Sequence, residues 1–215
     1  MRPHRSNTNA NANARLSLVV GARRGDPVDR ELVVGLIAGE AWAMVETWNR
    51  FAPMVLTTAR RALGSRTEAE DVVQDVFIQV FRKACTLRDP DSLRSFIYSF
   101  AVRVLKAELR RRKIRGWLLF LPDAPLDCGA RTLDVEARDL LRKLYALLDR
   151  LSPRNRLAFV LRRMEAMTVE EIAATMDIST STAKRAISHA VNRLSRWVDA
   201  DPELAGLRID RQGEA

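Results

Sequence analysis

The chain has 215 residues, 47% of them hydrophobic, with nine glycines, eight prolines and few aromatic residues, a composition that favours an all-α protein of one or two domains. Two distant cysteines and two histidines argue against a disulfide framework, a metal site or another cofactor. Neither a signal peptide nor an apolar run of ~18 residues is present, so we expect a cytoplasmic protein without membrane insertion. The net charge of +9 indicates a polyanionic partner, either nucleic acid or an anionic surface, with a merely solvated basic surface as the alternative.

The chain begins with a segment, residues 1–26, that is rich in Asn, Ala and Arg and has no helical or strand period, which predicts a disordered basic tail. Helical periodicity then runs from residue 27 to about residue 115, and we expect a first helical domain there. Gly39 and Gly64 predict helix ends, while Pro53 is expected to break or kink the helix between them.

The segment 67–84 is predicted to be an amphipathic helix, with Thr67 and Glu70 as a capping box at its start. Its apolar stripe consists of Val72, Val73, Val76, Phe77, Val80, Phe81 and Ala84. Its opposite face is acidic and amide-rich, and carries Asp71, Gln74, Asp75, Gln79 and Arg82, with Ile78 exposed beside them. In a basic protein this face favours protein binding, and a solvated helix face is the alternative.

A loop at 85–92 is followed by a long helix that becomes strongly basic. Residues 103–115 hold seven Lys or Arg against one Glu, which favours contact with a polyanion. Phe96, Tyr98 and Phe100 precede these cations, and rings beside cations suit stacking with unpaired bases. The same three rings are equally compatible with a hydrophobic core.

Residues 116–134 contain two Gly and two Pro and interrupt the helical period, which predicts a flexible linker. Its nineteen residues could span at most roughly 60 Å, at ~3.3 Å each, so that two domains could reach separate sites. A second helical domain is expected at 135–197, with Ser152 and Pro153 starting one of its helices, and a tail at 198–215.

The segment 168–194 is predicted to form a helix-turn-helix. Thr168 and Glu171 fit a capping box, and Ser179 or Thr180 caps the second helix. Its core face should contain Ile187, Val191 and Leu194. Its outer face carries Thr182, Lys184, Arg185, Ser188 and His189, whose chemistry suits duplex DNA. A helical hairpin with an ordinary charged face is the alternative.

Together the two halves resemble the bacterial sigma-70 family, and in particular its small two-domain extracytoplasmic-function (ECF) group. The matching stretches are EAEDVVQDVFIQVFRKA, RSFIYSFAVRVLKAELRRR and LSPRNRLAFVLRRMEAMTVEEIAATMDISTSTAKRAISHAVNRL. The resemblance implies a sigma region 2-like bundle at 27–115 and a region 4-like helix-turn-helix domain at 135–197. It also implies a non-enzymatic factor that binds core RNA polymerase and directs promoter-specific transcription initiation.

The resemblance further implies which residues act. The β′ clamp helices of the polymerase would dock on Asp71, Gln74, Asp75 and Ile78. The −10 element would be melted and captured by Phe96, Tyr98, Arg103, Lys106, Arg110 and Arg111. The −35 duplex would be bound by Thr182, Lys184, Arg185, Ser188 and His189. The β flap of the polymerase and an anti-sigma factor are further implied partners.

The sequence departs from the family pattern at a few positions. Phe96 stands where many relatives have Trp, and Arg103 stands where some have an amide. The segment 165–168 lacks the Gly often found before this helix, and the turn at 176–179 lacks the Gly that is frequent in helix-turn-helix motifs. These departures concern promoter preference and backbone geometry, not the class of function.

Two other functions are compatible with parts of the sequence. A plain helix-turn-helix regulator would explain 168–194 but not the acidic face or the basic helix. An enzyme such as a recombinase or nuclease would need clustered carboxylates or an activated nucleophile; Asp71 and Asp75 share a face without a third ligand, and Tyr98 is the one candidate nucleophile. Cys85 is expected to be a small buried residue, with redox sensing as the alternative for it and for Cys128.

Overall fold

The structure is a computed structural model that describes residues 27–87, 89–119 and 135–204, and every regular element in these ranges is helical. The predicted all-α fold is therefore confirmed. The expected basic tail at 1–26, most of the expected linker, Cys128 and the end of the C-terminal tail lie outside the described residues. None of the described helices combines the length and the apolar character needed to cross a membrane.

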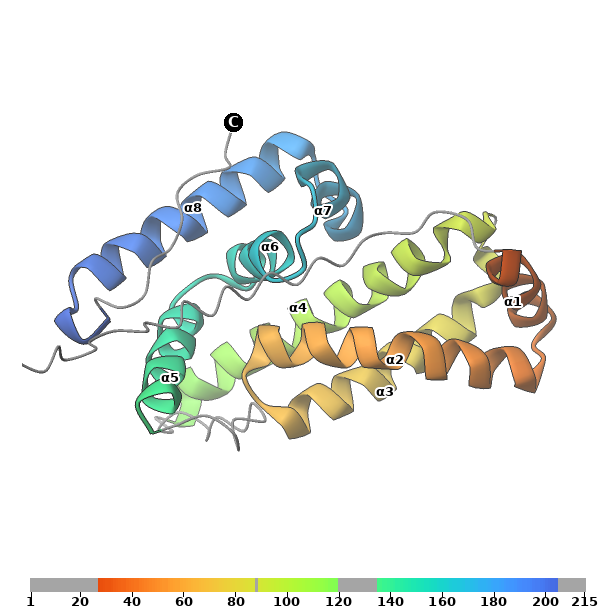
Figure 1. The fold of residues 1–215 in the computed structure, drawn as a ribbon, viewed down its shortest axis with the longest axis horizontal. Helices are drawn as coiled ribbons and strands as arrows, with labels where there is room; N and C mark the ends of the chain where they lie inside the picture. Colours follow the sequence, from red (N-terminus) through yellow and green to blue (C-terminus); the bar gives the residue numbers. More distant parts are fainter. Residues whose placement is uncertain (1–26, 88, 120–134, 205–215) are drawn as a thin grey trace, which may run out of the picture.

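The helices form two units (Figure 1). The first unit, residues 27–119, contains α1 (Pro27–Ala38), α2 (Ala41–Leu63), α3 (Arg66–Lys83) and α4 (Leu93–Leu119), with short 3₁₀ turns η1 (Ala84–Thr86) and η2 (Pro90–Ser92). The second unit, residues 135–204, contains α5 (Val135–Asp149), α6 (Pro153–Arg163), α7 (Val169–Met176), α8 (Thr180–Asp199) and the 3₁₀ turn η4 (Pro202–Leu204).

The core of the first unit lies where α2, α3 and α4 pack against one another. The apolar stripe predicted for α3 is buried there, apart from the half-buried Phe81 at its end. Helix α2 instead turns mostly small residues inward, among them Ala43, Thr47 and Ala59, and leaves Trp42 and Val45 exposed. The buried face of α2 therefore uses small residues that allow a close approach of neighbouring helices.

Several helix ends follow from local side chains. Ser152 and Ser179 cap α6 and α8, and the capping box of Thr168 and Glu171 at α7 is confirmed. Helix α3 is capped by Ser65 rather than by Thr67, because it begins at Arg66, two residues earlier than a Thr67 cap implies, and Ser65 accepts a hydrogen bond from the backbone N–H of Glu68.

Two turns in which the sequence lacks an expected glycine use other residues in the left-handed conformation. Asp177 has φ 53° at the end of α7, where its N–H bonds to the last carbonyls of the helix. Ala166 has φ 54° in the segment between α6 and α7. Asp tolerates this conformation better than Ala does, because its short polar side chain can bond locally.

Three features of the first unit differ in detail from what the sequence leads one to expect. Pro53 lies inside the continuous helix α2, where buried residues on either side hold the helix together despite the missing N–H. Helix α4 continues through Gly116 to Leu119, so it includes the first four residues of the expected linker. Cys85 is exposed because η1 turns its side chain away from the core.

Gly35 sets the distance between α1 and α2. A Cβ atom at this position would lie 2.7 Å from Cζ2 of Trp42 and 2.8 Å from Cβ of the buried Ala43. Trp42 is exposed and can swing aside, but Ala43 moves only with its helix. Gly35→Ala is therefore expected to lower the free energy of unfolding by about 1–2 kcal/mol, although Ala is favoured over Gly within a helix.

Chemical denaturation measures this change in the free energy of unfolding. Glu31→Ala, at an exposed position of the same helix, is the matched control, and we expect it to stay within about 0.5 kcal/mol of the parent. A Gly35→Ala protein that is as stable as the parent, or more stable, would show that α1 and α2 can separate without cost.

The second unit packs directly on the first. Helix α6 contacts both α2 and α4, and α7 contacts α4. Figure 1 shows α6 between α4 and α8, so that α8 lies on the far side of the second unit. In this arrangement the two units form one body, and the helix-turn-helix keeps its outer face away from α4.

Candidate functional site

The acidic face of α3 is open. Asp71, Gln74, Asp75 and Ile78 are all exposed, and Ile78 keeps 50% of its surface accessible. Their spacing places them on one side of the helix, opposite the buried valines. An exposed isoleucine among carboxylates and an amide has the composition of a protein contact with a positively charged partner.

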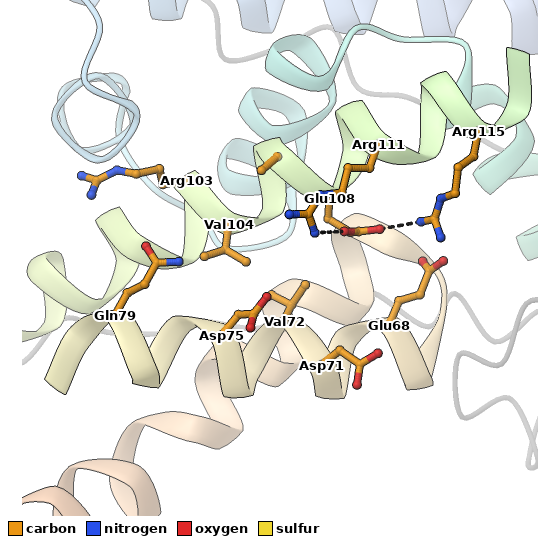
Figure 2. A pocket seen from close by; sticks show the side chains of 11 residues that line it. Glu68, Asp71, Val72, Asp75, Gln79, Arg103, Val104, Glu108, Arg111 and Arg115 are labelled. Carbon is orange, nitrogen blue, oxygen red and sulfur yellow. Dashed lines mark hydrogen bonds and ion pairs between the residues drawn. The ribbon is translucent and has the colours of Figure 1, made fainter. Parts of the chain in front are cut away.

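This acidic face borders the basic helix α4 across an open groove of about 480 Å³ (Figure 2). Asp71 and Asp75 line the groove from α3, and Arg103 and Arg111 line it from α4. Figure 2 also shows Glu108 of α4 bonded to two arginines, at 3.3 Å from Arg111 and 2.6 Å from Arg115. Two surfaces that the sequence separates by some thirty residues are thus neighbours.

The cations of α4 do not all face solvent. Arg103, Arg110 and Arg111 are exposed and Lys106 is half-buried. Arg112 points inward, donating to the carbonyl of Leu63 and to the Glu68 carboxylate, each at 2.7 Å. Part of the basic run is therefore structural, and the remaining cations form the exposed basic side of the helix.

The aromatic residues of α4 separate into two environments. Phe96 is half-buried and its ring meets Phe100 edge-on at 5.0 Å, while the Arg103 guanidinium lies 4.8 Å from the Phe100 ring. Tyr98 is only 2% exposed, and its hydroxyl donates to Glu165 of the second unit over 3.3 Å. Phe100 and Tyr98 are thus core residues in this arrangement, whereas Phe96 and Arg103 reach the open side.

The outer face of α8 is accessible as the sequence predicts. Lys184, Arg185 and His189 are exposed, Thr182 and Ser188 are half-buried, and the inward residues Ile187, Val191 and Leu194 are buried. The guanidinium of Arg185 donates to the Thr182 hydroxyl over 3.4 Å, which keeps it over the first turns of the helix. Cations and hydroxyls at the start of such a helix are suited to base edges and phosphates.

Sequence reasoning missed the contribution of α6 to this face. Arg154 and Asn155 line an open hollow of about 350 Å³ together with Arg185 and His189, and Asn155 Nδ2 lies 2.8 Å from His189 Nδ1. The sequence feature that could have indicated this contribution is the helix start at Ser152 and Pro153, because it places Arg154 and Asn155 in the first turn of that helix. Among the described residues, no group of three or more His, Cys, Asp or Glu could hold a metal ion.

Tyr98 offers a direct probe of its environment. Burial raises the pKa of its hydroxyl above the ordinary value of 10.0, the Glu165 carboxylate raises it further, and Arg94, 5.7 Å from the ring, opposes the shift. A raised pKa means that folding favours the neutral phenol, so the stabilisation is complete below pH 10 and is lost as the pH rises through the raised pKa.

Tyr145→Phe leaves Tyr98 as the only tyrosine, and its tyrosinate absorbance should appear with a midpoint above pH 10. Adding Glu165→Gln should lower that midpoint, because the carboxylate that disfavours the phenolate is removed. A midpoint at the ordinary value in the folded Tyr145→Phe protein would mean that Tyr98 is solvated.

Comparison with known proteins matches both units. Sigma-70 region 2 matches residues 47–114, and Sigma-70, region 4 matches residues 141–194. The ferric citrate uptake sigma factor FecI of Escherichia coli is 33% identical over 136 residues, covering 61% of this chain and 76% of FecI. The ECF RNA polymerase sigma factor SigM of Mycobacterium tuberculosis is 25% identical over 177 residues, covering 80% and 86%.

Solved structures show the same fold. CnrH, in complex with the cytosolic domain of CnrY, has a TM-score of 0.58 at 24% identity, covering 81% of this chain and 99% of CnrH. The sigma factor RpoE of Bartonella quintana, in complex with the anti-sigma factor NepR, has a TM-score of 0.53 at 20% identity, covering 73% and 96%. The similarity extends over both helical units, not over the helix-turn-helix alone.

Proposed function

Since the chain belongs to the sigma-70 family and is an ECF sigma factor, we propose that it divides polymerase binding, −10 capture and −35 binding among helices α3, α4 and α8. As a member of this family it directs transcription initiation through RNA polymerase and is not an enzyme. The observation that carries the division of roles is that one chain exposes three chemically different surfaces, one on each of these helices.

For polymerase binding, we propose that the β′ clamp helices contact Asp71, Gln74, Asp75 and Ile78. The apolar side chain of Ile78 can be desolvated at the centre of a contact, and the two carboxylates around it select a basic partner. The β flap is proposed to contact the region 4-like unit.

For the −10 element, we assign Phe96, Tyr98, Arg103, Lys106, Arg110 and Arg111. The Phe96 ring and the Arg103 guanidinium both contact the Phe100 ring. An unpaired base would therefore find a ring and a cation beside the same aromatic residue. Extruding a base costs a few kcal/mol, and stacking on such a platform offsets about 1–3 kcal/mol of it. Lys106, Arg110 and Arg111 would hold the phosphates that follow.

For the −35 element, we assign Thr182, Lys184, Arg185, Ser188 and His189, and add Arg154 from the start of α6. Arg154, Thr182, Arg185 and His189 line one hollow at the first turns of α8, and Lys184 and Ser188 lie on the same helix. Because they combine cations with hydroxyls and an imidazole, they can hold phosphates and contact base edges of a duplex.

We also propose domain limits, a cellular location and a further protein partner. The region 2-like domain is proposed to lie within the first unit and the region 4-like domain within the second, with a connection between them that lets them reach separate promoter elements. A cytoplasmic location follows from the proposed partners, polymerase and promoter DNA. An anti-sigma factor is also proposed as a partner, since relatives of this fold have been solved with CnrY and with NepR.

Run-off transcription tests the proposal. Purified core RNA polymerase is supplied with fragments of the protein's own genome, with and without the full chain. We expect discrete transcripts that depend on the protein, and their start sites should align to give two promoter elements. If the protein shifts duplex DNA but neither binds core polymerase nor produces transcripts, it acts as a helix-turn-helix regulator without polymerase binding.

A further inference from the structure

A hydrogen bond between two side chains that lie 34 residues apart in the sequence crosses the hollow at the start of α8. Asn155 Nδ2, from the first turn of α6, lies 2.8 Å from His189 Nδ1 of α8. The hollow is open and about 350 Å³ in volume, and both residues line it. The bond therefore connects α6 directly to one of the residues assigned to −35 DNA.

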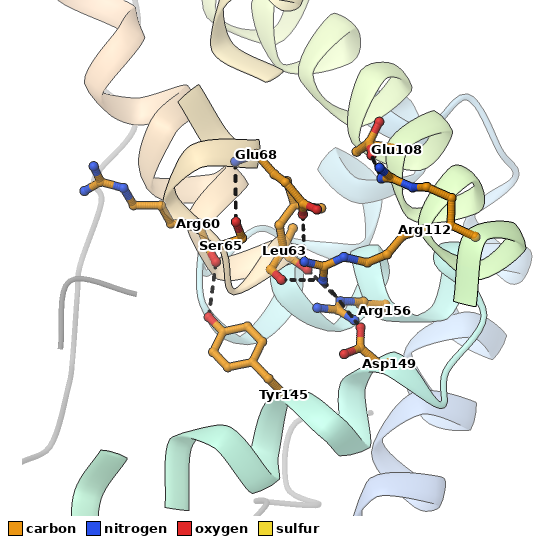
Figure 3. Close-up of polar contacts among 11 residues, drawn as sticks. Arg60, Leu63, Ser65, Glu68, Glu108, Arg112, Tyr145, Asp149 and Arg156 are labelled. Carbon is orange, nitrogen blue, oxygen red and sulfur yellow. Dashed lines mark hydrogen bonds and ion pairs between the residues drawn. The ribbon is translucent and has the colours of Figure 1, made fainter. Parts of the chain in front are cut away.

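Asn155 is held in place by the helix start around it. The residue is 8% exposed, and its backbone N–H donates to the Ser152 hydroxyl at 3.3 Å. The next residue, Arg156, is 2% exposed, donates from Nε to the Ala62 carbonyl at 2.6 Å and pairs with Asp149, beside which Figure 3 shows it. These contacts fix the first turn of α6 before and after Asn155, so the amide approaches the imidazole from one direction.

The bond determines which nitrogen of the imidazole carries a hydrogen. An amide nitrogen donates hydrogen bonds and does not accept them. His189 Nδ1 must then be the acceptor, and an imidazole whose Nδ1 accepts carries its hydrogen on Nε2. His189 therefore presents one N–H donor, at Nε2, to a molecule that lies over the hollow.

The hollow already contains the positive charge that holds a duplex. Arg154 lines it from α6 and Arg185 lines it from α8. Cations attract phosphates whatever the base sequence. A neutral donor adds little to that attraction, but a donor of fixed orientation can distinguish an acceptor from a donor on the edge of a base. The geometry of His189 is thus suited to base recognition rather than to holding the backbone.

We propose, resting on the proposed function, that Asn155 is a positioning residue for recognition of the −35 element, and that it directs the His189 Nε2–H at an acceptor atom of one base in the major groove. Guanine presents N7 and O6 in that groove and thymine presents O4, whereas cytosine presents only the donor group at N4. The protein therefore discriminates against cytosine at the base that His189 faces.

Nuclear magnetic resonance of the full chain tests the first half of the proposal without DNA. His4 is the only other histidine, so His4→Gln leaves a single imidazole. In mildly alkaline buffer, the ¹⁵N shifts of its ring nitrogens show which one carries the hydrogen. We expect Nε2 in the His4→Gln protein and Nδ1 after the further change Asn155→Asp, because a carboxylate only accepts. A hydrogen on Nδ1 before that change, or an equal mixture of the two forms, would overturn the proposal.

Duplex titrations test the second half. The probes are duplexes of a −35 element defined by run-off transcription, in which each base pair is replaced in turn. His189→Ala identifies the base pair that His189 contacts, because a preference of the parent is lost there. Asn155→Leu keeps a similar size and removes the donor, and Asn192→Leu makes the same change at an exposed asparagine of α8 as the matched control. Circular dichroism checks that each variant is folded.

We expect the parent to bind about tenfold more weakly when cytosine stands at that position. Asn155→Leu should reduce this discrimination to about twofold or less, because a free ring can turn and accept from cytosine with an unprotonated Nε2. The double variant of Asn155→Leu and His189→Ala should discriminate like His189→Ala alone, since both changes act on one contact. Asn192→Leu should keep the discrimination of the parent.

An equal loss of affinity on every duplex in folded Asn155→Leu would mean that Asn155 only supports the shape of the hollow, and it would overturn the proposal. Unchanged discrimination in this variant, or an equal loss of discrimination in Asn192→Leu, would overturn it too. The proposed function survives these results as long as the parent directs transcription. A parent that neither binds the duplex nor supports transcription would remove the proposed function and the base contact with it.

Discussion

Asp75→Arg is expected to weaken binding to core RNA polymerase by about 100-fold and to abolish transcription at ordinary concentrations. Asp75 lies exposed on α3 among the residues assigned to the clamp-helix contact. Reversing its charge replaces an attraction with a repulsion, and such a change costs several kcal/mol at a charged interface. A loss of about 3 kcal/mol corresponds to roughly two orders of magnitude in Kd.

The measurement is a fluorescence titration of labelled core polymerase, with duplex −35 binding by the same protein as a second readout. Glu46→Arg is the matched control, because it makes the same charge change at an exposed position of α2. We expect Glu46→Arg to bind polymerase like the parent and Asp75→Arg to keep its duplex affinity. Normal polymerase binding by Asp75→Arg would exclude this face from the contact.

Arg185→Ala is expected to reduce affinity for a −35 duplex by about 10- to 100-fold, since an arginine that contacts a base contributes about 1–3 kcal/mol. Arg185 is exposed at the first turns of α8 and is kept there by its bond to Thr182. The loss should be larger on the −35 sequence than on unrelated duplex DNA, because a base contact carries sequence information that a phosphate contact does not.

Titrations with both duplexes at two salt concentrations distinguish a base contact of Arg185 from a phosphate contact. Arg142→Ala removes the same charge from the exposed surface of α5, where Arg142 pairs with Asp139, and serves as the control. We expect Arg142→Ala to leave both affinities close to the parent value. Equal losses on both duplexes for Arg185→Ala would reassign this residue to the phosphate backbone.

Much of this fold could be predicted from local sequence because its causes are local. The buried stripe of α3 repeats every three or four residues, and the caps at Ser152 and Thr168 act within one turn. The exposed faces of α3 and α8 follow from the same periodicity. Family resemblance supplied the assignment of these faces to polymerase and DNA, and those residue roles remain predictions.

Local rules failed where packing outweighed them. Pro53 interrupts the predicted helical pattern, yet α2 continues through it. For Pro53, buried neighbours on the same helix compensate for the missing hydrogen bond. A preference of a few kcal/mol at one residue is easily overridden when several apolar side chains on both sides are buried.

Most of the helices, the caps at Ser152, Thr168 and Ser179, and the exposed faces of α3 and α8 follow from sequence alone, because periodicity and capping involve residues only a few positions apart. Only the tertiary structure decided that Tyr98 faces inward, since its partner Glu165 is 67 residues away. The pattern of α4 shows which residues could be buried, not what covers them. That depends on how the second unit docks, and docking brings together Arg61, Tyr98 and Glu165 from segments with no local relation.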